Sequence, residues 1–207
     1  MTGIATTTID LLRHAECEGG AIFRGSRDVA LAAAGWARLR RVAADVPDWQ
    51  WVTSSPLIRC RAFAEALAAE RGLACGVDAR FREMSFGAWE GRPVADVWAE
   101  EETAASAWLA DPEAHPPPGG EALAAVRARA REGFDDRIDA ARGSHGVIVT
   151  HGGLMRALLG DLLAMPGTAI QRLATPYACL SRLRVTHAAQ GDMLRLVGHN
   201  IGGDDVA

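Results

Sequence analysis

The chain has 207 residues, of which 49% are apolar, and a formal net charge of −4 at pH 7. A chain of this length can bury one substantial core, so we expect a single domain over residues 1–207. Charges of both signs are scattered along the chain, which excludes a basic stripe that binds nucleic acid. The apolar runs are shorter than the ~20 residues that span a bilayer, which excludes a membrane-spanning helix. With no signal-like N-terminus, we expect a cytoplasmic protein.

Strand and helix signals alternate along the chain. We expect strands at 6–12, 50–54, 73–77 and 146–150, helices at 35–46, 57–71 and 154–163, and a hairpin of 178–186 with 192–197. Alternation of this kind predicts an α/β fold, a three-layer α/β/α sandwich with a mostly parallel central sheet. The hairpin predicts an antiparallel edge on that sheet.

Residues 93–141 do not fit the alternation, because they hold two helical patterns, at 94–109 and 121–141, with no strand between them. The turn-rich stretch 111–120 separates the two patterns. We expect this whole segment to be a helical lid over the ends of the strands. Glu121 at the start of the second helix would favour its N-terminus electrostatically or take part in a site.

Two histidines follow directly on predicted strands. Arg13 and His14 come after the first strand, and His151 comes after the strand at 146–150, just before Gly152 and Gly153. Open α/β sheets bind ligands at the carboxyl ends of their strands. The sequence therefore predicts one shared site. His115, His145, His187 and His199 lack this setting, and we expect them at the surface.

Several other chemistries are disfavoured by residue usage. All 22 basic residues are arginine, so a phosphate-binding loop with its lysine and a Schiff-base lysine are both excluded. The four cysteines are too widely spaced for a zinc site or a redox pair. We expect no metal ion and no cofactor. Cys17, three residues after His14, is a candidate reactive thiol.

Four motifs in order resemble those of one family, the histidine phosphatases, also called the phosphoglycerate mutase-like superfamily. They are Leu12-Arg13-His14-Ala15-Glu16, Ser54-Ser55-Pro56-Leu57-Ile58-Arg59, the run from Arg82 to Gly91, and Val149-Thr150-His151-Gly152-Gly153. The resemblance implies the sandwich fold and phosphoryl-transfer chemistry. Ala15 stands where the family has glycine, and a positive φ there would strain alanine.

The resemblance implies that His14 is a nucleophile that takes up the phosphoryl group. A neutral imidazole is not repelled by a phosphate dianion, and it can attack through one ring nitrogen if the other donates its proton, most simply to a backbone carbonyl. Arg13, Arg59 and His151 would form a positive wall around the phosphoryl oxygens. A charged His151 would favour the transition state.

Hydrolysis also needs a group that first donates and then accepts a proton. The family motif places Glu83 in this role, with Glu90 as the alternative carboxylate. Arg24 and Gly25 align with a stretch that lines the family's substrate pocket. Gly152 is expected to bind substrate through backbone N–H groups at a helix start.

The segments 16–26 and 108–121 are most similar to those of the alpha-ribazole phosphatases, which implies hydrolysis of alpha-ribazole 5′-phosphate in cobalamin assembly. Trp98 and Trp108 could then stack on an aromatic substrate. Gly20 replaces the asparagine usual in mutases, which favours hydrolysis over transfer. A broad-specificity sugar-phosphate or fructose-bisphosphate phosphatase, a phosphoglycerate mutase and a non-catalytic binding module remain open. The expected partner is a small phosphate monoester, and the chain a monomer or homodimer.

Overall fold

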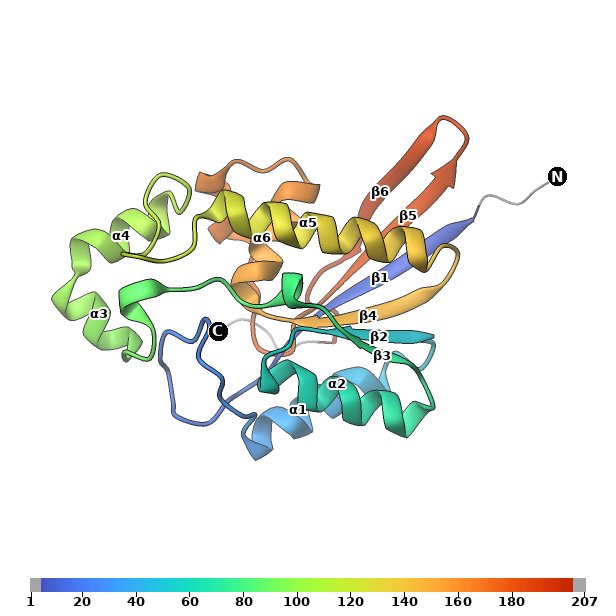
Figure 1. The fold of residues 1–207 in the computed structure, drawn as a ribbon, viewed down its shortest axis with the longest axis horizontal. Helices are drawn as coiled ribbons and strands as arrows, with labels where there is room; N and C mark the ends of the chain where they lie inside the picture. Colours follow the sequence, from blue (N-terminus) through green and yellow to red (C-terminus); the bar gives the residue numbers. More distant parts are fainter. Residues whose placement is uncertain (1–4, 203–207) are drawn as a thin grey trace.

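The computed structural model describes residues 5–202, which form one six-stranded sheet in the order β3-β2-β4-β1-β5-β6 (Figure 1). The strands are β1 (Thr6–Arg13), β2 (Trp51–Ser54), β3 (Cys75–Val77), β4 (His145–Thr150), β5 (Leu180–Ala188) and β6 (Gly191–Gly198). The first four strands in this sheet order are mutually parallel, whereas β5 pairs in antiparallel fashion with β1 on one side and with β6 on the other. The predicted α/β sheet with an antiparallel edge is confirmed.

Helices cover both faces of this sheet. One face carries α1 (Ala33–Ala44) and α2 (Ile58–Arg71), and the other carries α5 (Leu123–Ala140) and α6 (Gly152–Leu162) (Figure 1). Alternation along β1 supplies both cores, because Ile9 and Leu11 pack under α5 and α6 while Leu12 packs under α1 and α2. No helix in residues 5–202 has the length and apolar character needed to cross a bilayer.

The predicted lid differs in two ways. Its first part is two helices, α3 (Val94–Glu100) and α4 (Glu102–Ala110), and not one. The break falls at Glu101, whose carboxylate accepts hydrogen bonds from the Trp89 indole and from Arg92. The second difference is that α5 is no lid, because Phe134 and Ile138 bury its inner face against the sheet. Within the predicted lid, α3, α4 and the following loop lie beyond the strand ends (Figure 1).

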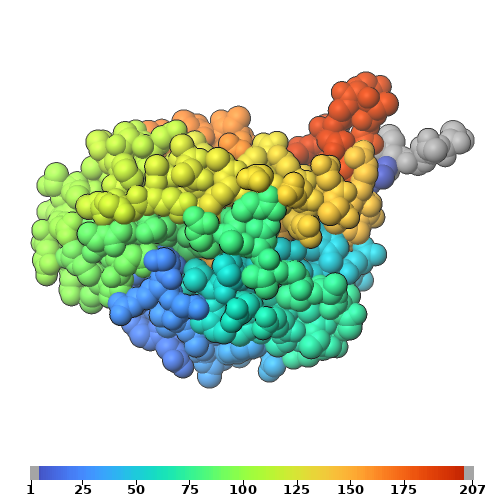
Figure 2. Space-filling model, in the orientation of Figure 1, coloured from blue at the N-terminus to red at the C-terminus, as the bar shows by residue number. Residues whose placement is uncertain are grey.

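The N-terminal loop between β1 and α1 packs against the segment that leads into α3. Phe23 exchanges backbone hydrogen bonds with Gly91 and Arg92, and Val94 donates to Ala21. Figure 2 shows these two segments in contact on the face it presents. The loop and the helices α3 and α4 therefore form one wall at the carboxyl ends of the strands.

The β5–β6 hairpin projects from the body of the molecule (Figure 2). His187 in β5 was expected at the surface, and this expectation is wrong. Its ring is buried, with Nδ1 2.7 Å from a carboxylate oxygen of Asp192 and Nε2 2.7 Å from Oγ1 of Thr7. Burial alternates along β5, which lies between β1 and β6, and His187 lies on the buried face.

Asp10 is a fully buried carboxylate in the middle of β1. It accepts hydrogen bonds from Nε1 of Trp49 at 2.8 Å, from Nε2 of His145 at 2.9 Å and from two nitrogens of Arg182 at 2.8 Å each. Burial disfavours the charged form, but the hydrogen bonds from Arg182, His145 and Trp49 outweigh it and lower the pKa of Asp10. The ionised carboxylate therefore joins β1, β4 and β5.

We expect Asp10→Asn to lower the free energy of unfolding by about 3 kcal/mol at pH 7, because it leaves the partners of a buried ion pair uncompensated. A lowered pKa stabilises the fold above the unfolded value of about 3.9, and that stability is lost as the pH falls through the folded value. The deficit should therefore shrink near pH 3. Urea unfolding at both pH values measures it.

The matched control is Asp161→Asn, which removes a partly exposed carboxylate 3.4 Å from Arg131. We expect this change to cost less than about 0.5 kcal/mol at either pH. An Asp10→Asn deficit of equal size at pH 7 and near pH 3 would contradict the assignment of a charged Asp10.

Candidate active site

His14 and His151 meet where β1 and β4 end. The parallel register pairs Arg13 with Thr150, and the backbone N–H of His14 donates to the carbonyl of Thr150 at 2.9 Å. The next side chains along both strands therefore lie together. The two imidazole rings are 5.2 Å apart, edge to face, and both are buried. The structure thus brings both predicted histidines into one site.

The hydrogen bonds of His14 define which ring nitrogen is free. Nδ1 lies 2.8 Å from the carbonyl oxygen of Ala15, which can only accept, so Nδ1 carries the proton. The lone pair is then on Nε2. The expected carbonyl partner is present, and it belongs to the next residue. Ala15 does not have a positive φ, so replacing the family's glycine causes no backbone strain here.

His14 is held in its neutral form. Burial is the main reason that its pKa lies well below the ordinary value of 6.5, and the positive charges of Arg13 and Arg59 lower it further. A buried cation beside two guanidinium groups would be strongly disfavoured. The ring is therefore ready to attack an electrophile without first losing a proton.

His151 is also held in its neutral form in the ligand-free protein. Its pKa lies well below 6.5 because of burial, with Arg59 and His14 as further causes. Nε of Arg59 donates to Nδ1 of His151 at 3.2 Å, which leaves the proton on Nε2, 2.7 Å from Oγ of Ser55. His151 thus has the opposite tautomer to His14.

Arg59 lies behind the histidines and does not line the cavity. It is fully buried, and its guanidinium donates to the carbonyls of Arg24, Gly25 and Arg27 at 3.1, 2.7 and 2.7 Å. These bonds satisfy a buried cation and fix the N-terminal loop. Gly25, expected to contact substrate, instead contacts Arg59 and Glu90, and a Cβ there would lie 2.3 Å from the carbonyl of Met84.

Arg13 and Arg24 do line the cavity. The Arg13 guanidinium lies 4.4 Å from the centre of the Tyr177 ring and donates to the carbonyl of Thr175. Nη2 of Arg24 donates to the carbonyls of Glu18 and Gly20. Nε of each arginine is buried and lacks an acceptor within residues 5–202. Both arginines are therefore held in place with donor capacity left for an anion.

Glu83 is anchored to the start of α6. Oε1 accepts from the N–H groups of Met84 and Leu154 at 3.0 and 2.8 Å, and Oε2 accepts from Gly153 at 3.0 Å. We had expected the N–H groups of this helix start to bind the substrate anion; two of them bind Glu83. The two glycines leave room for these side chains, because a Cβ on Gly152 would lie 2.9 Å from Nε of Arg13 and one on Gly153 2.7 Å from Oε1 of Glu83.

Glu90, the alternative proton carrier, has a different task. Its carboxylate accepts from the backbone N–H groups of Gly25, Ser26 and Phe86 and joins the two segments that form the cavity wall. It does not line the cavity. Among the residues that line it, Glu83 is the acidic side chain.

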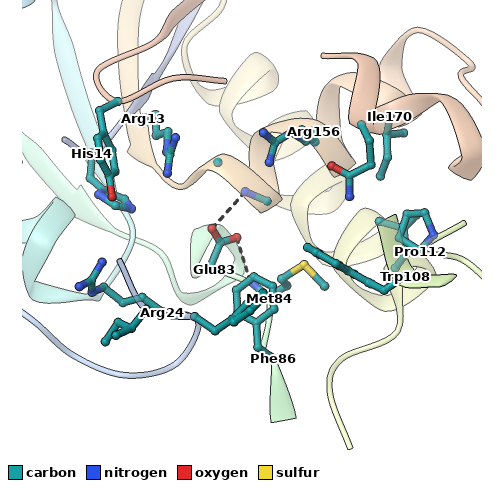
Figure 3. Close-up of a pocket in the computed structure, with 17 residues that line it drawn as sticks. Arg13, His14, Arg24, Glu83, Met84, Phe86, Trp108, Pro112, Arg156 and Ile170 are labelled. Carbon is teal, nitrogen blue, oxygen red and sulfur yellow. Dashed lines mark hydrogen bonds between the residues drawn. The ribbon is translucent and has the colours of Figure 1, made fainter. Parts of the chain in front are cut away.

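The cavity has a charged end and an apolar end (Figure 3). His14, Arg13, Arg24 and Glu83 define the charged end. The apolar end is lined by the side chains of Phe23, Met84, Phe86, Trp108, Pro112, Leu123 and Ile170. Trp108 thus faces the cavity as expected, whereas Trp98 packs in the aromatic cluster around Trp89.

Tyr177 and Arg156 line the cavity beside the predicted residues, and the sequence analysis identified neither. Tyr177 follows no strand and lies in a loop before β5, where no pattern singles it out. Arg156 lies on α6 one turn after Gly152, and that spacing could have identified it, because residues four apart share a helix face. Nε of Arg156 donates to the carbonyl of Leu173 at 3.0 Å, and the guanidinium points into the cavity (Figure 3).

The candidate reactive thiol is not activated. Burial raises the pKa of Cys17, although Arg24 and Arg59 oppose the effect, and its Sγ lies 3.6 Å from Nδ1 of His14. Within residues 5–202 no three acidic, histidine or cysteine side chains are grouped so that they could hold a metal ion.

Comparisons with known proteins agree with this geometry. A family profile described as histidine phosphatase superfamily (branch 1) matches residues 9–197. The probable phosphoglycerate mutase GpmB of Yersinia enterocolitica is 32% identical over 178 residues, which cover 84% of this chain and 82% of that protein.

Two solved structures are similar in fold. A mycobacterial glucosyl-3-phosphoglycerate phosphatase in complex with VO3 has a TM-score of 0.83 at 27% identity, covering 92% of this chain and 97% of that one. The alpha-ribazole phosphatase from Shigella flexneri has a TM-score of 0.74 at 24% identity, covering 97% and 99%. The second likeness concerns the fold alone.

We expect both site histidines to be neutral at pH 6.5, His14 as the Nδ1–H tautomer and His151 as the Nε2–H tautomer, because burial and neighbouring arginines lower both pKa values. Long-range ¹⁵N–¹H correlation spectra of the free protein report each tautomer directly. Spectra of His14→Gln and His151→Gln assign the signals. Half-protonation of either ring at this pH, or the same tautomer in both, would contradict the assignment.

Proposed function

Because the chain belongs to the histidine phosphatase superfamily and is an enzyme of the phosphatase class, we propose that it hydrolyses phosphate monoesters through a phosphohistidine on Nε2 of His14. The observation that carries the proposal is a neutral imidazole with a fixed Nδ1–H, facing a cavity lined by arginines. Imidazole supplies the nucleophile and the guanidinium groups neutralise the phosphoryl oxygens, so the chemistry needs no metal ion.

In the first step, Nε2 of His14 attacks phosphorus and the bond from phosphorus to the alcohol oxygen breaks. Glu83 in its protonated form gives its proton to the leaving oxygen. Oε2 suits this task, because it has one backbone partner where Oε1 has two. Arg13 and Arg24 hold the equatorial oxygens, and the Ala15 carbonyl stabilises the charge that develops on the ring of His14.

In the second step, a water takes the place of the alcohol and attacks phosphorus from the same side. Glu83, now a carboxylate, accepts the water proton, and the phosphorus–nitrogen bond breaks to return the electron pair to Nε2. The products are the alcohol and inorganic phosphate. Arg59 and His151 support both steps from behind, by fixing the loop of Arg24 and the ring of His14.

We propose alpha-ribazole 5′-phosphate as the substrate. The apolar end of the cavity supports this choice, because Trp108, Phe86 and Phe23 offer flat aromatic surfaces for a benzimidazole while the phosphate lies at His14. Gly20, in place of the mutase asparagine, supports hydrolysis over transfer to a second alcohol.

A second candidate is a phosphate monoester whose alcohol carries another anionic group, such as a phosphoglycerate or a fructose bisphosphate. Arg156 favours it, because its terminal nitrogens face the cavity beside the charged end. The 32% identical relative is a probable phosphoglycerate mutase, and one structural neighbour acts on glucosyl-3-phosphoglycerate.

We expect rapid acid-free quenching with a ³²P-labelled monoester to trap one phosphoryl group on His14, with base stability and acid lability. His14→Ala should abolish this label and lower kcat/KM at least about 1,000-fold, because the nucleophile is lost. The matched control His115→Ala changes an exposed histidine in the loop after α4 and should leave both measurements unchanged. Turnover without a trapped phosphohistidine would contradict the mechanism, and the absence of any turnover would favour a binding module.

We expect alpha-ribazole 5′-phosphate to give the highest kcat/KM in a panel with 3-phosphoglycerate, glucosyl-3-phosphoglycerate and fructose bisphosphates, assayed with chelator present. Trp108→Ala should lower kcat/KM for alpha-ribazole 5′-phosphate about 10-fold, which corresponds to the loss of one aromatic contact, and should leave kcat/KM for 3-phosphoglycerate unchanged. Arg156→Gln should lower kcat/KM for 3-phosphoglycerate and leave that for alpha-ribazole 5′-phosphate unchanged. A preference for a carboxylated substrate that is lost in Arg156→Gln would establish the second candidate. Similar kcat/KM values for all substrates would indicate broad specificity. Loss of activity with chelator would refute the imidazole mechanism.

A further inference from the structure

We propose that Arg129 is a positioning residue for the reaction, because it holds the backbone of residues 80–83 and thereby aims the carboxyl group of Glu83. Arg129 lies on α5, does not line the cavity and was not singled out by any sequence motif. The proposal rests on the proposed function of Glu83 as proton carrier.

The guanidinium of Arg129 is bound to three carbonyls of the segment that leads to Glu83. Nη1 donates to the carbonyls of Arg80 and Arg82 at 2.7 Å each, and Nη2 donates to the carbonyl of Glu83 itself at 3.3 Å. The Arg129 side chain is only 11% exposed. These bonds fix the peptide from which the Glu83 side chain extends.

Glu121 holds Arg129 in turn. Its two carboxylate oxygens lie 2.8 Å from Nε and 2.9 Å from Nη2 of Arg129, a two-pronged pairing across the start of α5. Glu121 also lies 3.4 Å from the backbone N–H of Ser85, two residues after Glu83. Glu121 had been expected to favour the helix N-terminus or to take part in the site; instead it supports the site through Arg129.

All five N–H groups of Arg129 are used by these contacts, one on Nε and two on each terminal nitrogen. A lysine has its donors on one nitrogen and cannot reach three carbonyls and a carboxylate together. Arg129→Lys therefore keeps the charge and removes the geometry. The exchange tests positioning and not electrostatics.

Glu83 is thus fixed at both ends by different helices. The N–H groups at the start of α6 hold its carboxylate, and Arg129 of α5 holds its backbone. Proton transfer to a leaving oxygen requires hydrogen-bonding distance, so a displacement of even 1 Å lowers its rate sharply. Without Arg129 the peptide of Glu83 can shift while the rest of the cavity stays in place.

This role has a signature that a general loss of structure lacks. A good leaving group needs no proton from Glu83 when it departs, whereas a poor one does. p-Nitrophenyl phosphate and phenyl phosphate share a flat ring that fits the apolar end, and nitrophenolate is much the better leaving group. The ratio of their rates of phosphohistidine formation therefore reports proton donation.

The experiment measures single-turnover phosphohistidine formation from both esters in the full-length enzyme. We expect Arg129→Lys to slow the reaction with phenyl phosphate about 30-fold and with p-nitrophenyl phosphate less than about 3-fold, as for partial loss of general acid catalysis. Glu121→Gln, which weakens the hold on Arg129, should give the same pattern to a smaller extent. The matched control is Arg131→Lys, two residues along α5, where the arginine is half-exposed and pairs with Asp135; it should change neither rate.

The outcomes separate this proposal from the proposed function. Glu83→Gln should reproduce the pattern of Arg129→Lys with a larger effect on phenyl phosphate. If Glu83→Gln shows no dependence on the leaving group, Glu83 is not the proton donor and the proposed function fails. If Glu83→Gln shows the dependence on the leaving group but Arg129→Lys slows both esters equally, or slows neither ester, the positioning role is overturned. An equal loss of both rates because Arg129→Lys unfolds the enzyme also overturns it.

Discussion

The parallel pairing of β1 with β4 is the constraint on which the site depends. It sets Arg13 opposite Thr150, so β1 and β4 end side by side. The ring centres of His14 and His151 are therefore 5.2 Å apart. A shift of one residue in this register would turn each side chain to the other face of the sheet. The pairing is secured from below by Asp10, which ties β1 to β4 through His145 and to β5 through Arg182. The chemistry at one end of the strands thus relies on a buried ion pair in their middle.

Burying two imidazoles beside two guanidinium groups has an energetic cost, and the structure offsets it with backbone carbonyls and not with carboxylates. Arg59 donates to three carbonyls of the N-terminal loop, and Arg13 donates to that of Thr175. A carboxylate in these places would neutralise the cations and weaken their attraction for phosphate. Carbonyl partners hold the guanidinium groups while leaving their net charge intact. Burial is the main cause of the lowered pKa of His14, and the positive charges of Arg13 and Arg59 add to it. In the proposed mechanism, the same guanidinium groups would also attract the phosphate dianion.

Much of this could be predicted from the sequence, because it follows from regular periodicity. Strand alternation and chain direction placed His14 and His151 at one edge of the sheet. Other features depend on irregular backbone and could not be predicted: the carbonyls that accept from Arg59 lie in a loop without a repeat, and Glu101, at the break between α3 and α4, binds Trp89 and Arg92 through its side chain. The role of Arg129 could not be predicted either, because an arginine on an amphipathic helix is expected to be solvent-exposed unless its neighbours in the fold are known. Spacing could have revealed only Arg156.

The two ends of the cavity are formed by different parts of the fold. At its charged end, Arg13 and His14 are placed by the end of β1, which the register of the sheet fixes, and Glu83 is held by the N–H groups at the start of α6. Its aromatic part comes from segments outside the sheet: Phe23 of the N-terminal loop, Phe86 of the segment before α3 and Trp108 of α4 pack on one another. In the proposed function, substitutions there would change the alcohol that fits without disturbing His14. Relatives that share this fold can therefore differ in substrate, and in this chain the proposed function assigns the choice of alcohol to Trp108 and Arg156 rather than to the histidines.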